Sequence, residues 1–84
     1  MHHVTLKLYA TLRKKAGIAE MQCEAATVRD AMAALAKKVG PENEKHVKMC
    51  NVFLNSNNIT ALQGPLTKLK EGDTLHIFPP MGGG

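Results

Sequence analysis

Hydrophobic and polar positions alternate at the start of the chain in the pattern of a half-buried strand. Val4, Leu6 and Leu8 share one side of this segment, and the residues between them take the other side. A basic stretch at 10–16, which we expect to be a turn, leads to a second alternating segment at 20–24. Together the two alternating segments predict a β-hairpin.

The period then changes to that of an amphipathic helix. Thr27 is a good N-cap, and Asp30 stands three residues later, where an acidic side chain can complete a capping box. One apolar stripe follows at helical spacing, made of Val28, Ala31, Met32, Leu35 and Val39. Gly40 and Pro41 are typical residues beyond a helix end, so the helix should finish before them.

Strand-like alternation resumes after a polar segment at 41–49, which has room for a short helical turn. We expect strands at 51–55 and 74–78, whose inward side chains are Val52, Leu54, Leu75 and Ile77. Between these strands we expect an Asn-rich turn at 55–58, a short return strand at 59–62, a helical turn that packs Leu66 and Leu69, and a turn at 71–73.

The expected order is two strands, one main helix and then three strands. A sheet with one apolar face covered by one amphipathic helix is an α+β two-layer domain. We therefore predict a β-grasp fold, as in ubiquitin-like proteins, with a mixed sheet of four to five strands. The domain should span 1–78, and a flexible Gly-Gly tail should occupy 79–84.

Composition and charge narrow the function classes. The 84 residues make one small domain with a formal charge of +4, and the charges are scattered along the chain. No arginine-rich helix or RNA-binding aromatic signature is present, so we expect no nucleic-acid partner. No segment is apolar enough for a membrane span or a signal peptide, which favours a cytoplasmic protein. Cys23 and Cys50 lack the spacing of a zinc or redox motif, so no metal site is expected.

The three aromatic residues of the chain are expected outside the core. Strand alternation places Tyr9, Phe53 and Phe78 on the sheet face away from the helix. Large apolar groups outside a core are typical of a docking surface, and we expect Ile59 to extend it. A register error of one residue would instead return these side chains to the core.

The final six residues read Pro79-Pro80-Met81-Gly82-Gly83-Gly84. Two prolines fix φ and favour an extended segment that holds the tail away from the domain. Glycines have no Cβ to obstruct a narrow channel. The α-carboxylate of Gly84 is therefore a candidate reactive group that could enter the active site of another protein. A frayed terminus would have the same composition.

Several segments together resemble the ubiquitin-like sulfur carriers, and most closely the small subunit of molybdopterin synthase. The matching segments are Val4–Ala10 with Leu12-Arg13 and Ala16-Gly17, Thr27–Ala31 with Leu35, Val52–Asn55, Pro65-Leu66 with Glu71–Leu75, and Phe78–Gly84. The ending, Phe-Pro-Pro followed by glycines, is the most specific part of the resemblance.

The resemblance implies a mechanism. An activating enzyme that consumes ATP would adenylate Gly84, and a sulfur donor such as a cysteine desulfurase or a rhodanese-like protein would convert it to a thiocarboxylate. The large subunit, in a heterotetramer with two carriers, would then receive the tail and pass its sulfur to precursor Z to form the dithiolene. Gly83 would belong to the reactive site with Gly84, because it leaves access to the terminal carbonyl. The partner-binding residues would be Tyr9, Phe53, Ile59 and Phe78, together with the tail residues Pro79, Pro80, Met81 and Gly82. The domain itself would bind no cofactor and would not be a catalyst alone.

Three other functions are compatible with the same ending. The carrier could serve thiamine synthesis or tRNA thiolation with the same tail chemistry. It could be a ubiquitin-like protein modifier, in which a lysine amine attacks the activated carboxylate instead of sulfur. It could also be a small binding domain with an inert tail, which an activating enzyme would not adenylate.

Overall fold

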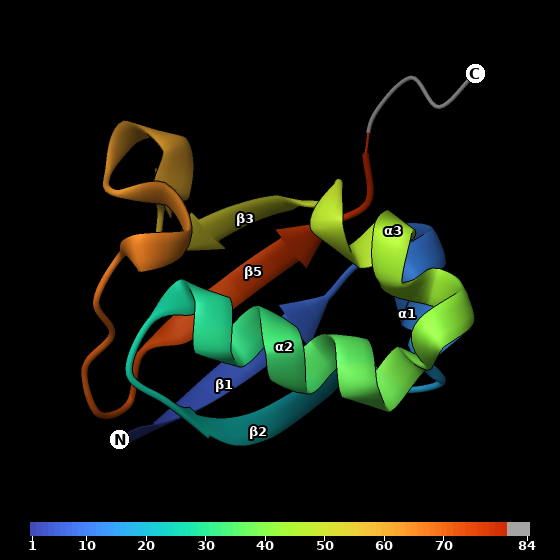
Figure 1. Cartoon of the computed structure of the whole chain (residues 1–84), viewed down its shortest axis with the longest axis horizontal. Helices are drawn as coiled ribbons and strands as arrows, with labels where there is room; N and C mark the ends of the chain where they lie inside the picture. The colour runs from blue at the N-terminus through green and yellow to red at the C-terminus, as the bar shows by residue number, and fades with distance from the viewer. Residues whose placement is uncertain (81–84) are drawn as a thin grey trace.

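A computed structural model describes residues 1–80 of the chain, with a five-stranded sheet covered on one face by a long helix (Figure 1). The strands are β1 (His2–Leu8), β2 (Glu20–Ala25), β3 (Asn51–Leu54), β4 (Asn57–Asn58) and β5 (Thr74–Phe78). The helices are α1 (Ala10–Ala16), α2 (Val28–Val39) and α3 (Glu44–Lys48), with 3-10 turns η1 (Pro41–Asn43), η2 (Ile59–Ala61) and η3 (Gly64–Leu66).

The sheet is mixed, in the order β2-β1-β5-β3-β4. β1 and β5 lie side by side in the centre and run parallel, with Thr5 opposite Thr74 and Leu8 opposite Ile77. All other neighbours are antiparallel. The predicted α+β, β-grasp architecture is therefore confirmed.

The core lies between the sheet and α2, as the hydrophobic pattern predicted. The inward residues of the two central strands and the α2 stripe, except Met32, are almost inaccessible, with Leu6, Leu35 and Leu75 all 0% exposed. Met32 and Leu54 are half-buried and pack against this core. Full burial of a large aliphatic side chain contributes roughly 1.5–3 kcal/mol. A shift of one residue in the strand pairing would turn these side chains to the other face, so their burial fixes the register of the sheet.

The predicted capping box at the start of α2 is present. The backbone N–H groups of Thr27 and Ala26 donate to Asp30 Oδ2 at 3.1 and 3.0 Å, and the Asp30 N–H donates to Thr27 Oγ1 at 3.4 Å. The backbone bonds from Ala26 and Thr27 to the carboxylate, with smaller contributions from the Thr27 side chain and the charge of Arg29, hold the pKa of Asp30 below its usual value.

The expected turn at 10–16 is wrong, because this segment forms helix α1. Leu12 is 0% exposed and anchors the helix to the core, while Gly17 ends it with a φ of 75° and an N–H that donates to Arg13 O at 2.9 Å. The left-handed conformation at Gly17 costs little because glycine has no Cβ. A single buried leucine was too weak a periodic signal to predict this helix.

The segment after β3 also differs from expectation. The return strand is β4 at Asn57–Asn58, two residues earlier than expected, and 59–61 is a 3-10 turn capped by Asn58 Oδ1, which accepts from Thr60 N–H at 2.9 Å. Leu69 is buried as predicted, but Leu66 is 57% exposed and does not pack in the core. Polar asparagines form this strand because only two residues pair at the sheet edge.

No helix in residues 1–80 is long and apolar enough to cross a membrane. The division into a domain at 1–78 and a tail at 79–84 stays a prediction, because residues 81–84 lie outside the described part of the chain.

Candidate functional site

Three aromatic side chains gather on the sheet face opposite α2. Tyr9 and Phe78 stack with ring centroids 4.4 Å apart and planes at 11°, and Phe53 meets Phe78 edge-on at 5.7 Å. All three are half-buried and none belongs to the core cluster. Their predicted placement outside the core is confirmed, and we call Tyr9, Phe53, His76 and Phe78 the aromatic cluster.

His76 is the member of this cluster that the sequence did not single out. Its Nδ1 lies 2.8 Å from Tyr9 Oη, and the two rings stack at 5.9 Å. Phe53 is its partner across the β3–β5 pair. Strand alternation places His76 outward, on the same face as Phe78, but the sequence has no signal for its hydrogen bond to Tyr9.

A shallow groove on this face joins the aromatic cluster to polar side chains. Its lining combines three rings with three amides: Phe53, His76, Phe78, Asn51, Asn55 and Asn58. Rings supply apolar contact area, and amides can both donate and accept hydrogen bonds. This combination of apolar and amide groups suits a protein surface as partner.

The aromatic cluster lies where the tail leaves the domain. Phe78 ends β5 and is followed directly by Pro79 and Pro80, both half-buried. The Tyr9 N–H donates to Ile77 O at 3.2 Å, which ties the end of β1 to the end of β5. The predicted reactive residue Gly84, with Gly83, Gly82 and Met81, lies outside the described residues.

Ile59 does not extend the aromatic cluster, which corrects our placement of it. Its side chain packs against the core instead, in a groove on the helix side that Met32, Val47 and Val52 also line. The expectation relied on a strand at 59–62, and the 3-10 turn there changes the direction of the side chain.

The two thiols are poorly suited to nucleophilic chemistry. Burial raises the pKa of Cys50 to about 11, and its Sγ donates to His46 O at 3.2 Å. Burial, and to a smaller extent the charge of Asp30, also raises the pKa of Cys23. Both groups are therefore protonated thiols near neutral pH, and a protonated thiol is a weak nucleophile.

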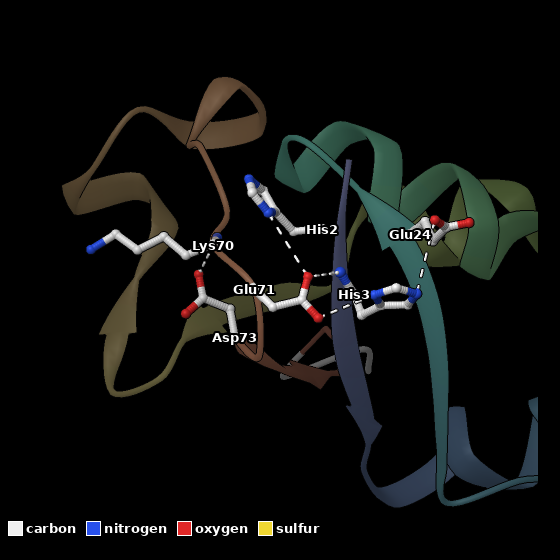
Figure 2. Close-up of polar contacts among 6 residues, drawn as sticks. All are labelled: His2, His3, Glu24, Lys70, Glu71 and Asp73. Carbon is white, nitrogen blue, oxygen red and sulfur yellow. Dashed lines mark hydrogen bonds and ion pairs between the residues drawn. The ribbon is translucent and has the colours of Figure 1, made fainter.

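Apart from the aromatic cluster, a group of polar side chains lies at the opposite end of β1 from the tail (Figure 2). Glu71 accepts from the His3 N–H at 2.9 Å and lies 3.1 Å from His3 Nδ1, with His2 Nδ1 at 3.9 Å. These contacts, led by the backbone bond from His3, lower the pKa of Glu71. No group of three or more His, Cys, Asp or Glu side chains among residues 1–80 is arranged to hold a metal ion.

Comparison with known proteins gives the family. The sequence profile of the ThiS family matches residues 6–84. A protein of Archaeoglobus fulgidus named "Putative sulfur carrier protein" is 27% identical over 96% of this chain and 98% of its own length.

Solved structures agree with this assignment. The small archaeal modifier protein 1 of Methanosarcina acetivorans is 33% identical, with a TM-score of 0.86 over 100% of this chain and 98% of its own. A Pyrococcus furiosus protein named "Putative molybdopterin converting factor, subunit 1" has a TM-score of 0.78 at 24% identity, over 96% of this chain and 100% of its own, which shows a shared fold. The chain therefore belongs to the ThiS family of ubiquitin-like sulfur carriers.

Proposed function

We propose that this member of the ThiS family carries sulfur as a thiocarboxylate on Gly84 and is the small subunit of a molybdopterin synthase. The observation that supports this proposal best is the position of the aromatic cluster, which includes Phe78, directly before the Pro-Pro-Met-Gly-Gly-Gly ending. A partner that docks on Tyr9, Phe53 and Phe78 would receive the tail at its own active site. The open sheet face would supply affinity, and the glycine end would supply the chemistry.

The chemistry follows from the weak electrophilicity of a carboxylate. In an activating enzyme, a Gly84 oxygen attacks the α-phosphorus of ATP, and pyrophosphate leaves. The persulfide of a donor such as a cysteine desulfurase or rhodanese-like protein then attacks the acyl carbon, and AMP leaves with the oxygen. A thiol reduces the acyl disulfide that forms, which releases the thiocarboxylate and leaves a disulfide between that thiol and the donor's cysteine. The resulting thiocarboxylate is a softer nucleophile than the carboxylate. The partners provide ATP binding and catalysis, so the carrier needs no cofactor of its own.

The acceptor we propose is precursor Z, in the active site of the large subunit. Two loaded carriers would supply the two sulfur atoms of the dithiolene, in a heterotetramer built on a dimer of large subunits. The Phe78-Pro79-Pro80 ending supports this choice over a carrier for thiamine or tRNA thiolation, because it resembles the small-subunit ending. We expect the protein to act in the cytoplasm.

A second candidate function is protein modification. It is favoured by the 33% identity to a protein named small archaeal modifier protein 1. The same adenylate would then be attacked by a lysine amine, which forms an isopeptide bond and releases AMP. An inert tail, as in a simple binding domain, would give no adenylate at all.

A transfer assay tests the proposed acceptor. The thiocarboxylated chain is mixed with precursor Z and the large subunit of molybdopterin synthase from the source organism. We expect molybdopterin to form while the carrier returns to the carboxylate mass, with two carriers consumed for each product molecule. Loaded carrier that keeps its sulfur with an active large subunit would contradict the molybdopterin role. Conjugates of the chain with lysines of cellular proteins would favour the modifier function.

A further inference from the structure

Charge is distributed unequally between the two ends of the molecule. α1, the last turn of α2, η1 and α3 lie together at the end where β5 finishes, and we call this region the tail pole (Figure 1). It carries seven cationic side chains, Arg13, Lys14, Lys15, Lys37, Lys38, Lys45 and Lys48. Only two acidic residues, Glu42 and Glu44, lie among them.

The remaining charges nearly balance. Lys7 and Glu20 face each other in the β1–β2 register. At the opposite end of the sheet, three cationic residues accompany four acidic ones: Arg29, Lys68 and Lys70 with Glu24, Asp30, Glu71 and Asp73. The tail pole therefore carries an excess of five positive charges, and the opposite end an excess of one negative charge.

Contacts between the elements hold the tail pole together. α1 and α3 both pack on α2, and α3 also packs on η1. The Tyr9–Ile77 backbone bond fixes the start of α1 beside the end of β5. All seven cationic side chains are exposed, so their charge acts outward from this end.

Local stabilisation does not account for this excess. Helix C-termini favour cations, and the last turns of α1, α2 and α3 hold all seven of these cations. Each helix end carries roughly half a negative charge, so three ends offset only about one and a half of the five. One ion pair, from Lys48 to Glu44 at 3.4 Å, lies within the tail pole.

We propose that the tail pole steers this carrier onto an acidic surface bordering the channel of its activating enzyme. This inference rests on the proposed function. Four residues separate Pro80 from the Gly84 carboxylate, a reach of at most about 14 Å. The Debye length is about 10 Å at 0.1 M salt, which is similar to this reach. A protein that receives the tail therefore lies within range of the positive charge around the tail exit.

A protein partner fits the tail pole better than a nucleic acid. Proteins that bind single strands stack the bases on aromatic platforms set among their cations. Here the three aromatic residues lie on the open sheet face, whereas all seven cations lie on helices. Six of the seven cations are lysines, which act as point charges rather than bidentate donors. Such a surface is suited to long-range attraction, which mainly changes the association rate.

Charge reversal at each end provides a matched test. K14E/K15E changes the tail pole, and K68E/K70E makes the same charge change at exposed positions of the opposite end. The measurement is pyrophosphate release by the activating enzyme of the source organism, as a function of carrier concentration. We expect K14E/K15E to lower kcat/KM roughly three- to tenfold at about 50 mM salt, with kcat unchanged. The control should stay within about twofold, and the difference should vanish near 0.5 M salt.

A second tail-pole variant and a stability measurement complete the test. K37E/K38E repeats the test on α2, and thermal melting shows whether each variant keeps the fold. Folded tail-pole variants that match K68E/K70E at low salt would overturn the proposal. A second outcome would also overturn the proposal. If K14E/K15E keeps the wild-type kcat/KM for activation but loses binding to bulk tRNA that the wild-type chain shows, the tail pole is a nucleic-acid surface. If the wild-type chain is not adenylated at all, the proposed function itself fails, and steering fails with it.

Discussion

At the scale of single residues, the aromatic cluster brings together side chains distant in sequence. Tyr9, Phe53 and Phe78 come from three different strands or strand ends, and each ring contacts another at 4.4 or 5.7 Å. A half-buried aromatic residue contributes little to a core that is already filled by aliphatic side chains. Its contact area is therefore available to a partner, where aromatic residues contribute strongly to binding.

Truncation of Phe53 tests this role. Phe53→Ala removes an edge-to-face contact, so we expect about 1 kcal/mol less stability. If the ring docks the activating enzyme, KM for the carrier should rise roughly tenfold. Leu66→Ala is the matched control, because Leu66 is apolar and 57% exposed but lies outside the cluster. Equal KM values for the two variants would remove Phe53 from the docking surface.

At the scale of elements, strong periodicity decided what could be predicted from the sequence. α2 and the central strands were predictable because several buried side chains repeat at one period. α1 has a single buried residue, Leu12, and β4 has two asparagines, so neither produces a hydrophobic pattern. Ile59 was misplaced for the same reason: a 3-10 turn has no two-residue alternation. His76 became apparent only when its hydrogen bond to Tyr9 was seen.

The contact between β1 and the turn at 71–73 predicts a pH dependence of stability. Binding to His3 lowers the pKa of Glu71 from its usual 4.5. A carboxyl whose pKa is lower in the folded state stabilises the fold above its unfolded pKa. That stabilisation is lost as the pH falls below 4.5 and through the folded value.

Urea unfolding of Glu71→Gln and wild type at pH 7, 4.5 and 3 measures this effect. We expect the variant to be less stable at pH 7 and the difference between the two proteins to shrink towards pH 3. Glu20→Gln, at an exposed position on β2 away from these histidines, is the control. A difference that is constant with pH would show that Glu71 acts through packing alone. Asp30 keeps its lowered pKa in both proteins and so cancels from the comparison.

At the scale of the whole molecule, three features meet at one end. The aromatic cluster, the tail exit and the excess positive charge all lie where β5 finishes, while the opposite end is nearly neutral. A partner that uses all three would obtain affinity from the sheet face, a faster encounter from charge, and chemistry from the C-terminal glycine.

The most direct test is the intact mass of the chain after incubation with the activating enzyme of the source organism, ATP and sulfide. We predict a shift equal to one oxygen replaced by sulfur, located on Gly84 by fragmentation. A chain extended by one alanine after Gly84 should keep its mass, because its carboxylate lies one residue farther out and carries a Cβ that obstructs a channel shaped for glycine. Its melting temperature should match wild type. No shift and no AMP adduct on the wild-type chain, with an enzyme proven active on another carrier, would contradict a sulfur-carrying role.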